Sequence, residues 1–346
     1  MQSSDPPPKT RKRPHNRAAA ITTLDVAAMA GVSAMTVSRV LNTPDKVAPA
    51  TVARVREAIE RTGFVPNMLA GALSSQRTRL IAAIVPEMAN TMFAKTIQAF
   101  CDVMAAAGYQ VLFGLSGYPH SQEDSLLSAI LARRPDALYL TGIERSQETR
   151  RRLLAAKIPV VECWDLTPTP LDMVVGFSHA DCGRAIAGHL LAKGHRRIGA
   201  VWADDARAGM RLRHLQRTLA EAGAPPAIEA ISAAPSTLRA GREGLARLLD
   251  AGHRLDAIAC SSDALAQGVL AGVLSRGLRI PQDLAVIGFG DVDAAASTYP
   301  TLTTVRIESA AMGRLAAEGL LRRLSGDESG PKVSDTGFSI VERESA

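Results

Sequence analysis

Residues 22–42 read TTLDVAAMAGVSAMTVSRVLN, a stretch that fits two short helices joined by a tight turn. One of the two leading threonines can cap the first helix, because apolar residues at helical spacing follow them. Gly31 can take the positive φ of the turn, and Ser33 can cap the second helix. The second helix presents small and polar residues beside Arg39, and such a face suits a recognition helix in a DNA major groove. The stretch therefore predicts a helix–turn–helix.

A compact DNA-binding headpiece is expected over residues 21–64. A third helix should follow Pro49, where apolar residues again recur at helical spacing, and Gly63 should end it. The side of the second helix that is expected to pack inward carries three apolar residues, Val37, Val40 and Leu41.

The basic residues of the chain are concentrated in its first quarter. Residues 1–80 hold 12 Lys or Arg against 5 Asp or Glu, which gives +7, and the other residues hold 28 against 29, which gives −1. The whole basic excess therefore lies near the helix–turn–helix and indicates a polyanionic partner. Residues 1–20, with PPP and KTRKR, are expected to form a disordered basic tail, either a solvated leader or a nonspecific phosphate contact.

Composition and motifs disfavour several other classes of protein. Four widely spaced cysteines suit a reducing compartment and the packing of small apolar side chains, so neither a disulfide nor a metal site is expected. No apolar run approaches the roughly 18 residues that cross a bilayer, and no secretory signal is visible, so we expect a cytoplasmic protein without a membrane partner. The sequence holds no HExxH, GxSxG or Walker A motif, so neither an enzymatic activity nor a cofactor is expected.

Residues 65–79 are expected to form a hinge helix and a linker. Pro66 interrupts the preceding structure, Asn67 can cap a helix, and apolar residues then recur at helical spacing. A helix of only two turns that contains Gly71 is marginal in isolation, so it should form only when a partner packs against it. This segment is therefore a candidate switch.

From residue 80 onward, apolar runs alternate with amphipathic stretches of helical length. Repeated units of this kind predict an α/β body with parallel, doubly wound sheets, divided into two lobes with a ligand cleft between them. The runs expected to form strands are LIAAIV, YQVLFGL, DALYLTG, PVVECW, MVVGF, RIGAVWA, DAIACSS and LAVIGFG. The clearest helices are expected at residues 91–107, 122–133, 181–193, 211–222 and 263–276. The final segment, SDTGFSIVERES, is expected to add a closing strand.

Six motifs in order resemble the LacI/GalR family of bacterial transcription regulators over residues 21–343. They are LDVAAMAGVSAMTVSRVLN, FVPNMLAGAL, KGHRRIGAV, SSDALAQGVL, IPQDLAVIGFGD and PTLTTVR. Within this family the sequence is most similar to the gluconate-utilisation repressors. The features shared with that subgroup are VSAMTVSRVL, PVVECWD running into LDMVVGF, and TGF near the end.

The resemblance implies a homodimer or a tetramer, with a dimer favoured, in which each headpiece reads half of a near-palindromic operator. It also implies that residues 80–346 form a two-lobed body of the periplasmic-binding-protein type I fold. One lobe is expected to hold residues 80–176 and 306–332, and the other residues 177–305 and 333–343. Two hinge helices would meet in the central minor groove, where Leu73 either wedges into a base step or is a linker residue that packs on the body.

The resemblance assigns DNA contacts to the recognition helix and the hinge. Arg39 is expected either to bind a guanine through two hydrogen bonds, worth roughly 1–3 kcal/mol of discrimination, or to clamp a phosphate. Ala34 and Met35 lie where relatives vary their base contacts, and Met35 is alternatively part of the core. Phosphate contacts or capping are expected of Thr22, Ser33, Thr36, Ser38 and Asn42, and hinge contacts of Asn67, Ala70 and Leu73.

Parallel sheets bind ligands beyond the carboxyl ends of their strands, and many polar residues follow the strands expected here. A polyol needs bidentate acceptors for neighbouring hydroxyls, and a sugar acid also needs a cation for its carboxylate. The strand-end residues are Glu87, Met88, Asn90, Thr141, Glu144, Glu162, Trp164, Asp165, Asp204, Asp205, Arg207, Arg211, Ser262, Asp263, Asp291 and Asp293.

The effector site expected from this set, together with Phe93 and Arg213, comprises Asn90, Phe93, Glu162, Arg207, Arg213, Ser262, Asp263, Asp291 and Asp293. Arg207 matches the family's ligand-binding arginine and is expected either to clamp a carboxylate or to form an ion pair, on the surface or between the lobes. Arg213 is either a second cation of the site or a solvated one. Phe93 either walls the pocket or is part of the core, and Asp263 either binds ligand or caps a helix.

The loop after IGF departs from the common family pattern. Many members carry an aspartate directly after the aromatic residue, where this chain has Gly290. Asp291 or Asp293 is therefore expected to supply the carboxylate that binds a ligand hydroxyl.

These observations predict a DNA-binding transcriptional repressor of sugar-acid catabolic genes that an effector such as gluconate releases from its operator. Within the family, the alternatives are a regulator of a different sugar and a corepressor-type regulator whose ligand strengthens DNA binding. Outside the family, the alternative is a two-lobed solute-binding protein or enzyme, which the headpiece and the missing signal and catalytic motifs disfavour.

Overall fold

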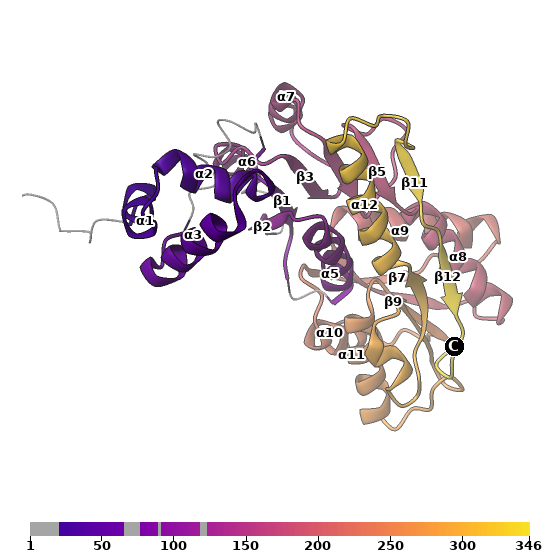
Figure 1. Ribbon diagram of the computed structural model, residues 1–346. Helices are drawn as coiled ribbons and strands as arrows, with labels where there is room; N and C mark the ends of the chain where they lie inside the picture. Colours follow the sequence, from indigo (N-terminus) through magenta and orange to yellow (C-terminus); the bar gives the residue numbers. More distant parts are fainter. Residues whose placement is uncertain (1–20, 66–76, 89–90, 118–122) are drawn as a thin grey trace, which may run out of the picture. The chain divides into compact units, whose positions relative to one another are not determined.

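The computed structural model describes residues 21–65, 77–88, 91–117 and 123–346 (Figure 1). The chain divides into two compact units, the first ending at Thr78 and the second running from Arg79 to Ala346. Each unit is built around apolar cores of its own, the headpiece core in the first unit and larger cores in the second.

Three helices and one 3-10 turn form the headpiece: α1 Thr23–Ala30, α2 Ala34–Asn42, η1 Pro44–Lys46 and α3 Pro49–Thr62. Gly31 has φ 63° and ends α1, and Gly63 has φ 64° and ends α3, both in the left-handed region that glycine adopts readily. Helices α1 and α2 meet at 101°, an angle typical of a helix–turn–helix. No single helix among the described residues is long and apolar enough to cross a membrane, and α1 and α2 reach that length and composition only as this bent pair.

The first lobe of the body is a six-stranded parallel sheet in the order β11-β5-β4-β3-β1-β2. Its strands are β1 Leu80–Val85, β2 Gln110–Leu115, β3 Ala137–Thr141, β4 Val160–Cys163, β5 Met173–Gly176 and β11 Val333–Asp335. Its helices are α5 Thr91–Ala106, α6 Glu123–Leu131, α7 Gln147–Ala156 and α12 Ser309–Leu324. Alternate residues of β1 belong to two different apolar cores, so both faces of the sheet are covered.

The second lobe has a six-stranded sheet in the order β12-β10-β9-β8-β6-β7, in which only β12 runs antiparallel to its neighbour. Its strands are β6 Ile198–Asp204, β7 Ile228–Ala233, β8 Ala257–Cys260, β9 Ala285–Gly290, β10 Thr303–Ile307 and β12 Phe338–Val341. Its helices are α8 His179–Ala192, α9 Ala206–Glu221, α10 Leu238–Asp250 and α11 Asp263–Ser275, with the 3-10 turn η2 Asp293–Ala296. The α/β fold class and the doubly wound sheets predicted from the sequence are confirmed.

The chain passes between the lobes three times, and Figure 1 shows the last passage as the successive yellow strands β11 and β12. The expected lobe boundaries at 306 and 333 are wrong by a few residues. Residues 303–307 form β10 of the second sheet, and residues 333–335 form β11 of the first. The boundary at 333 was misplaced because β11 reads Val-Ser-Asp and carries no apolar run.

Each of the eight apolar runs corresponds to a strand, and each of the five expected helices corresponds to a helix. The largest shift affects α9, which begins at Ala206 rather than at residue 211. Strands β7, β10 and β11 and helices α7, α10 and α12 were not among the expected elements. This earlier start of α9 matters, because the first turns of that helix carry the cations of the cleft.

Candidate functional site

The recognition helix α2 exposes one polar face. Its exposed residues there are Met35, Ser38, Arg39 and Asn42. Met35 is 66% exposed and so is not part of the core, whereas Val37 and Val40 are buried on the opposite side. Leu41, which was expected to pack inward, is 38% exposed, because it lies about 100° around the helix from Val40 and falls at the edge of the buried side.

Several polar side chains of the headpiece satisfy helix ends. The backbone N–H of Thr36 donates to Ser33 Oγ at 3.2 Å, which caps α2. The backbone N–H and the hydroxyl of Thr22 both donate to Asp25 Oδ2 at 2.7 Å, at the start of α1. Asn42 Nδ2 donates to a backbone carbonyl one turn earlier at 2.9 Å. Capping is thus present at Ser33 and at the Thr22–Asp25 pair, and phosphate contacts by these residues stay a prediction.

Arg39 lies on the exposed face of α2, and its Nη2 lies 3.8 Å from Met35 Sδ. Ala34 is half-buried at the start of the same helix. The headpiece therefore presents the guanidinium of Arg39 beside the thioether of Met35 and the small side chains of Ala34 and Ser38. Such a surface is suited to base edges and methyl groups. The hinge residues Asn67, Ala70 and Leu73 lie outside the described residues.

A small cavity of about 60 Å³ lies between the two lobes of the body and is called the inner cavity below. Its walls include Glu87, Met92, Phe93 and Trp164 from the first lobe and His179, Asp205, Arg207, Arg211, Ser262 and Phe289 from the second. Phe93 and Trp164 meet edge to face with ring centroids 4.9 Å apart. Burial raises the pKa of Glu87 above its ordinary value. The inner cavity thus combines aromatic walls with ionisable groups from both lobes.

Arg211 is the buried cation of the inner cavity. It is 5% exposed, and its guanidinium lies 4.0 Å from the centroid of the Phe289 ring. Its Nη1 donates to His179 Nδ1 at 2.9 Å and its Nη2 to the Ser261 carbonyl at 3.1 Å. Its Nε has no hydrogen-bond partner among the described residues. Burial lowers the pKa of Arg211 from its ordinary value, and nearby Asp205 is the largest opposing influence. Because arginine stays protonated, the cavity holds a buried positive charge.

His179 fixes the orientation of that guanidinium. Burial, followed by the charge of Arg211, lowers the pKa of His179 well below its ordinary value, so the ring is neutral. Since Nδ1 accepts from Arg211, Nε2 carries the proton and donates to the Trp164 carbonyl at 2.8 Å. A chain of hydrogen bonds therefore runs from the end of β4 in the first lobe to α9 in the second.

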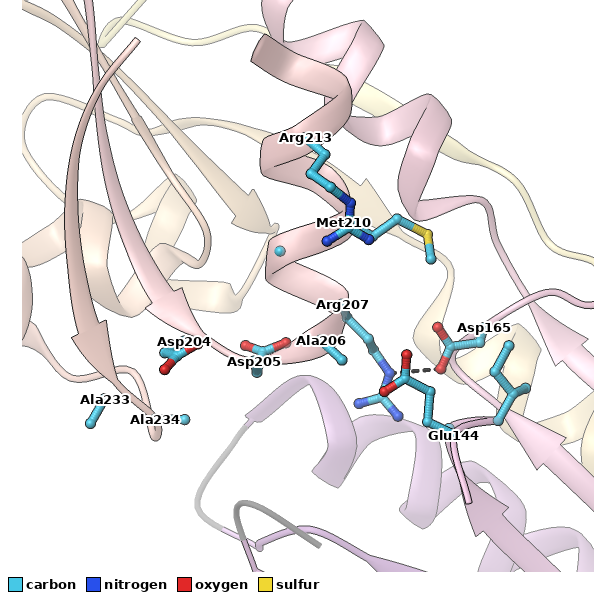
Figure 2. A pocket seen from close by; sticks show the side chains of 13 residues that line it. Glu144, Asp165, Asp204, Asp205, Ala206, Arg207, Met210, Arg213, Ala233 and Ala234 are labelled. Carbon is cyan, nitrogen blue, oxygen red and sulfur yellow. Dashed lines mark hydrogen bonds and ion pairs between the residues drawn. The ribbon is translucent and has the colours of Figure 1, made fainter. Parts of the chain in front are cut away.

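A larger cavity of about 640 Å³ adjoins the first and is called the outer cavity below. Figure 2 shows Arg207 reaching toward Asp165, with Nε 2.8 Å from Oδ2 and the two side chains 14% and 10% exposed. This ion pair joins the two lobes. A Cβ at Gly142 would lie 2.3 Å from Arg207 Nη2, so any other residue there would have to displace the guanidinium from its present position. Both cavities are lined by Asp205, Arg207 and Ala234.

Comparison with known proteins identifies this architecture. Residues 22–67 match the bacterial regulatory proteins of the lacI family, and residues 187–346 match the periplasmic binding protein-like domain. The HTH-type transcriptional regulator GntR of Pseudomonas aeruginosa is 38% identical over 323 residues, which cover 93% of this chain and 94% of that protein. The chain belongs to the LacI family of bacterial regulatory proteins.

Solved structures of relatives share this fold over most of the chain. A LacI-family transcriptional regulator from Silicibacter pomeroyi is 33% identical with a TM-score of 0.89, over 94% of this chain and 99% of that chain. The transcription regulator GntR from Chromobacterium violaceum is 37% identical with a TM-score of 0.74, over 77% of this chain and 98% of that chain. The resemblance inferred from the sequence is confirmed, and the chain is a DNA-binding transcriptional regulator.

Four residues expected at the effector site of this LacI-family regulator line the two cavities. Phe93 and Ser262 line the inner cavity, Arg213 lines the outer one, and Arg207 lines both. Ser262 also caps α11 by accepting from the Leu265 N–H at 3.3 Å. Arg207 forms the ion pair between the lobes that was one of its two expected roles. Asn90 lies outside the described residues.

Glu162 does not belong to the cleft, so its assignment to the effector site is wrong. It is fully buried and accepts from Arg145 Nη1 at 3.0 Å and from the Leu171 N–H at 2.8 Å. Side chains alternate along β4, and Glu162 shares its face with Val160, which belongs to the core containing residues of α6 and α7. The carboxylate therefore points away from both cavities.

Asp263 lines neither of the two cavities and is 1% exposed. It accepts from Thr304 Oγ1 at 2.6 Å and from the Val292 N–H at 2.9 Å, so it ties the loop after β9 to β10. Both expected roles, ligand binding and helix capping, give way to this internal bridge, because Ser262 already caps α11.

Asp291 and Asp293 are also absent from the walls of both cavities. Asp291 forms ion pairs with Arg306 at 2.6 Å and with Arg343 at 2.7 Å. Asp293 is 89% exposed and pairs with Lys95 of the first lobe at 2.5 Å. Both carboxylates therefore form ion pairs and line neither cavity, although many family members carry an aspartate where this chain has Gly290. A Cβ at Gly290 would lie 2.4 Å from Met92 Sδ, so this glycine lets the two lobes approach closely.

Arg211, His179 and Asp205 form the polar centre of the inner cavity, and none of the three is in the expected effector site. Arg211 follows Arg207 by four residues, so the two lie on one side of α9. This spacing was the available signal. It was missed because the helix was expected to begin at Arg211 itself.

Proposed function

We propose that the chain is a cytoplasmic, dimeric repressor that binds a near-palindromic operator and releases it when a sugar acid such as gluconate enters the cleft. In this proposal the protein binds its ligand and catalyses no reaction. Membership of the LacI family supports the repressor role, and the polar face of α2 supports operator binding. The charge of the inner cavity supports an acid as the effector.

Each headpiece reads half of the operator through α2. Arg39 donates to a guanine edge in the major groove, and Met35 packs against a thymine methyl group. Ser33, Thr36, Ser38 and Asn42 lie near phosphates and set the position of the helix. The exposure of Met35 and Arg39 on one face supports this assignment.

The observation that carries the effector assignment is the buried guanidinium of Arg211. Its Nη1 and Nη2 bind neutral acceptors, and its Nε has no partner among the described residues. A buried charge without a direct counter-ion costs several kcal/mol. A ligand carboxylate supplies that counter-ion through charge-assisted hydrogen bonds, whereas a neutral sugar does not. Asp205 and Ser262, in the same walls, can bind neighbouring hydroxyls.

The cleft couples to the headpieces because both lobes supply its walls. A ligand that contacts both lobes favours one arrangement of them, and residues 65–79 connect that arrangement to the headpieces. Coupling of this kind is typically worth about 1–3 kcal/mol, which weakens the operator complex by roughly 5–150-fold. A corepressor would bind the same cleft, but its coupling free energy would have the opposite sign, so that the ligand would strengthen operator binding.

The test is fluorescence anisotropy of the full-length protein on DNA from upstream of its own gene, at fixed salt, with and without millimolar D-gluconate. Release by gluconate is the expected result. Tighter binding with gluconate would assign the corepressor mode, and an unchanged affinity would exclude gluconate as the effector.

A set of arginine variants locates the carboxylate site. Arg211→Gln should keep operator binding and lose its response to gluconate. Arg217→Gln, on an exposed part of the same helix, is the matched control and should respond like the wild type. Arg207→Gln separates the two cleft arginines, because a lost response in this variant alone would assign the clamp to Arg207.

A further inference from the structure

The inner cavity is too small for the effector proposed above. A volume of about 60 Å³ lies well below the roughly 300–1,000 Å³ of pockets that enclose whole small-molecule ligands. A six-carbon acid with a hydroxyl on nearly every carbon needs far more room. A ligand whose carboxylate reaches Arg211 must therefore extend past Arg207, where the inner cavity meets the outer one.

The outer cavity is more than large enough for the remainder of a six-carbon chain. Its 640 Å³ lies within the range of pockets that enclose whole small-molecule ligands, about 300–1,000 Å³. Its walls come from both lobes: Gly142, Ile143 and Glu144 from the first, and the first turns of α9 and the end of β7 from the second. A ligand with a second ring or chain joined to the acid would fill this space.

The charges of the outer cavity favour a neutral group there. Its walls hold two arginines, Arg207 and Arg213, against four carboxylates, Glu144, Asp165, Asp204 and Asp205. Arg207 is already paired with Asp165, so carboxylates outnumber the other cations around the remaining space. A phosphate or a second carboxylate would meet net repulsion, whereas hydroxyl groups can donate to these carboxylates.

The apolar part of the same walls suits the C–H face of a sugar ring. Figure 2 shows Met210 and Ala206 on α9, with Ala233 and Ala234 at the end of β7 and the carboxylates of Asp204 and Asp205 between them. Apolar walls with a few placed polar groups are the usual composition of a small-molecule site. Hydroxyl acceptors beside apolar surface are what a glycosyl residue requires.

We propose that the outer cavity is a subsite for a neutral glycosyl residue, so that the effector class includes aldobionic acids, in which a sugar is joined to a sugar acid. The inference rests on the proposed function, since it takes the carboxylate to lie at Arg211. The carboxylate lies in the inner cavity, the rest of the acid's carbon chain passes Arg207, and the glycosyl residue lies against Glu144, Asp204 and Met210 in the outer cavity.

Isothermal titration calorimetry on the full-length protein tests the subsite with three ligands: D-gluconate, lactobionate and 6-phosphogluconate. Lactobionate should bind at least tenfold more tightly than 6-phosphogluconate, because only the latter brings a second anion to the carboxylates. If gluconate binds and lactobionate does not, the subsite is overturned and the proposed function stays intact. Tighter binding of 6-phosphogluconate than of lactobionate would overturn the neutral occupant. Failure of all three acids would overturn the sugar-acid effector and the subsite together.

A variant that fills only the outer cavity supplies the second measurement. Ala233 is exposed at the end of β7 and lines the outer cavity but not the inner one, so Ala233→Trp reduces the outer volume without touching Arg211. Lactobionate affinity should fall at least tenfold and gluconate affinity should change less than threefold. Ala233→Ser is the matched control and should bind both ligands like the wild type. Equal losses for the two ligands in Ala233→Trp would contradict the subsite.

Discussion

Asp263 shows how an acid at a strand end can serve the fold rather than a ligand. It is buried at the start of α11, and its two oxygens accept from Thr304 Oγ1 and the Val292 N–H. Burial raises the pKa of Asp263 to about 6, and the two hydrogen bonds only partly oppose that increase. The folded protein therefore holds this proton more tightly than the unfolded chain does.

The raised pKa predicts a pH-dependent stability that Asp263→Asn should remove. For a carboxyl whose folded pKa lies above its ordinary 3.8, stability is fully present below about pH 4 and is lost as pH rises through the folded value near 6. Relative to Asp263→Asn, the wild type should lose up to about 3 kcal/mol over that interval. Asparagine can accept from the Val292 N–H and donate to Thr304 Oγ1, so the variant should fold.

Urea unfolding followed by tryptophan fluorescence measures this difference. Both tryptophans of the chain, Trp164 and Trp202, lie in the body, so their emission reports on the body and not on the headpiece. The experiment compares wild type with Asp263→Asn at several pH values between 4 and 7. A free-energy difference that stays constant over that range would show that Asp263 does not titrate there.

At the scale of elements, the body of α9 could be predicted from the sequence, but its first turn could not. The stretch DDARAG precedes an obvious amphipathic run, and its aspartates and glycine look like a loop. In the structure Asp205 caps α9 by accepting from the Ala208 N–H at 2.8 Å, so the helix starts five residues earlier than expected. The additional turn places Arg207 and Arg211 on one side of the helix. An aspartate that can cap a helix is visible in the sequence, but the backbone N–H that it binds is not.

Some strands could also be predicted from apolar runs in the sequence, and others could not. Strands inside the sheets, such as β3 and β9, are buried throughout and read as continuous apolar runs. Strands β7 and β11, which lie at sheet edges, and β10, which lies inside its sheet but begins with two threonines, carry no such run. The site residues show a related difficulty. Glu162 lies inside β4 rather than after it, and because side chains alternate along a strand, its carboxylate points away from the cleft.

The N-cap of the recognition helix provides a test at the same scale. Ser33→Ala removes the acceptor of the Thr36 N–H and should cost about 1 kcal/mol of helix stability. Ser33→Asp retains a cap, and its charge suits a helix N-terminus, so this helix should be as stable as in the wild type. If Ser33 lies near a phosphate, Ser33→Asp should nevertheless weaken operator binding more than Ser33→Ala.

Hydrogen exchange of the backbone amides in residues 33–42 measures the first effect, and operator anisotropy measures the second. Faster exchange is expected in Ser33→Ala alone, and weaker operator binding mainly in Ser33→Asp. If the operator affinity instead follows helix stability in both variants, Ser33 acts only as a cap and makes no phosphate contact.

At the scale of the whole body, the ion pairs Arg207–Asp165 and Lys95–Asp293 both join the lobes. Arg207 and Asp165 are 14% and 10% exposed, whereas Lys95 and Asp293 are 47% and 89% exposed. An exposed pair is screened by water and is worth about 0–1 kcal/mol, whereas loss of one partner of a buried pair costs about 3–5 kcal/mol. The Arg207–Asp165 pair should therefore dominate the arrangement of the lobes, although both pairs are short.

Two matched neutral variants separate these contributions. Asp165→Asn withdraws the carboxylate from Arg207 and should lower the free energy of unfolding of the body by about 2–4 kcal/mol, because the pair is largely but not fully buried. Asp293→Asn should change it by less than about 0.5 kcal/mol. Urea midpoints from tryptophan fluorescence at pH 7 compare the two variants with the wild type. Equal stability of all three proteins would mean that aromatic packing around Trp164 and Phe289, rather than the ion pairs, holds the two lobes together. The shape of a ligand, rather than its effect on these ion pairs, would then decide how the lobes rearrange when it binds.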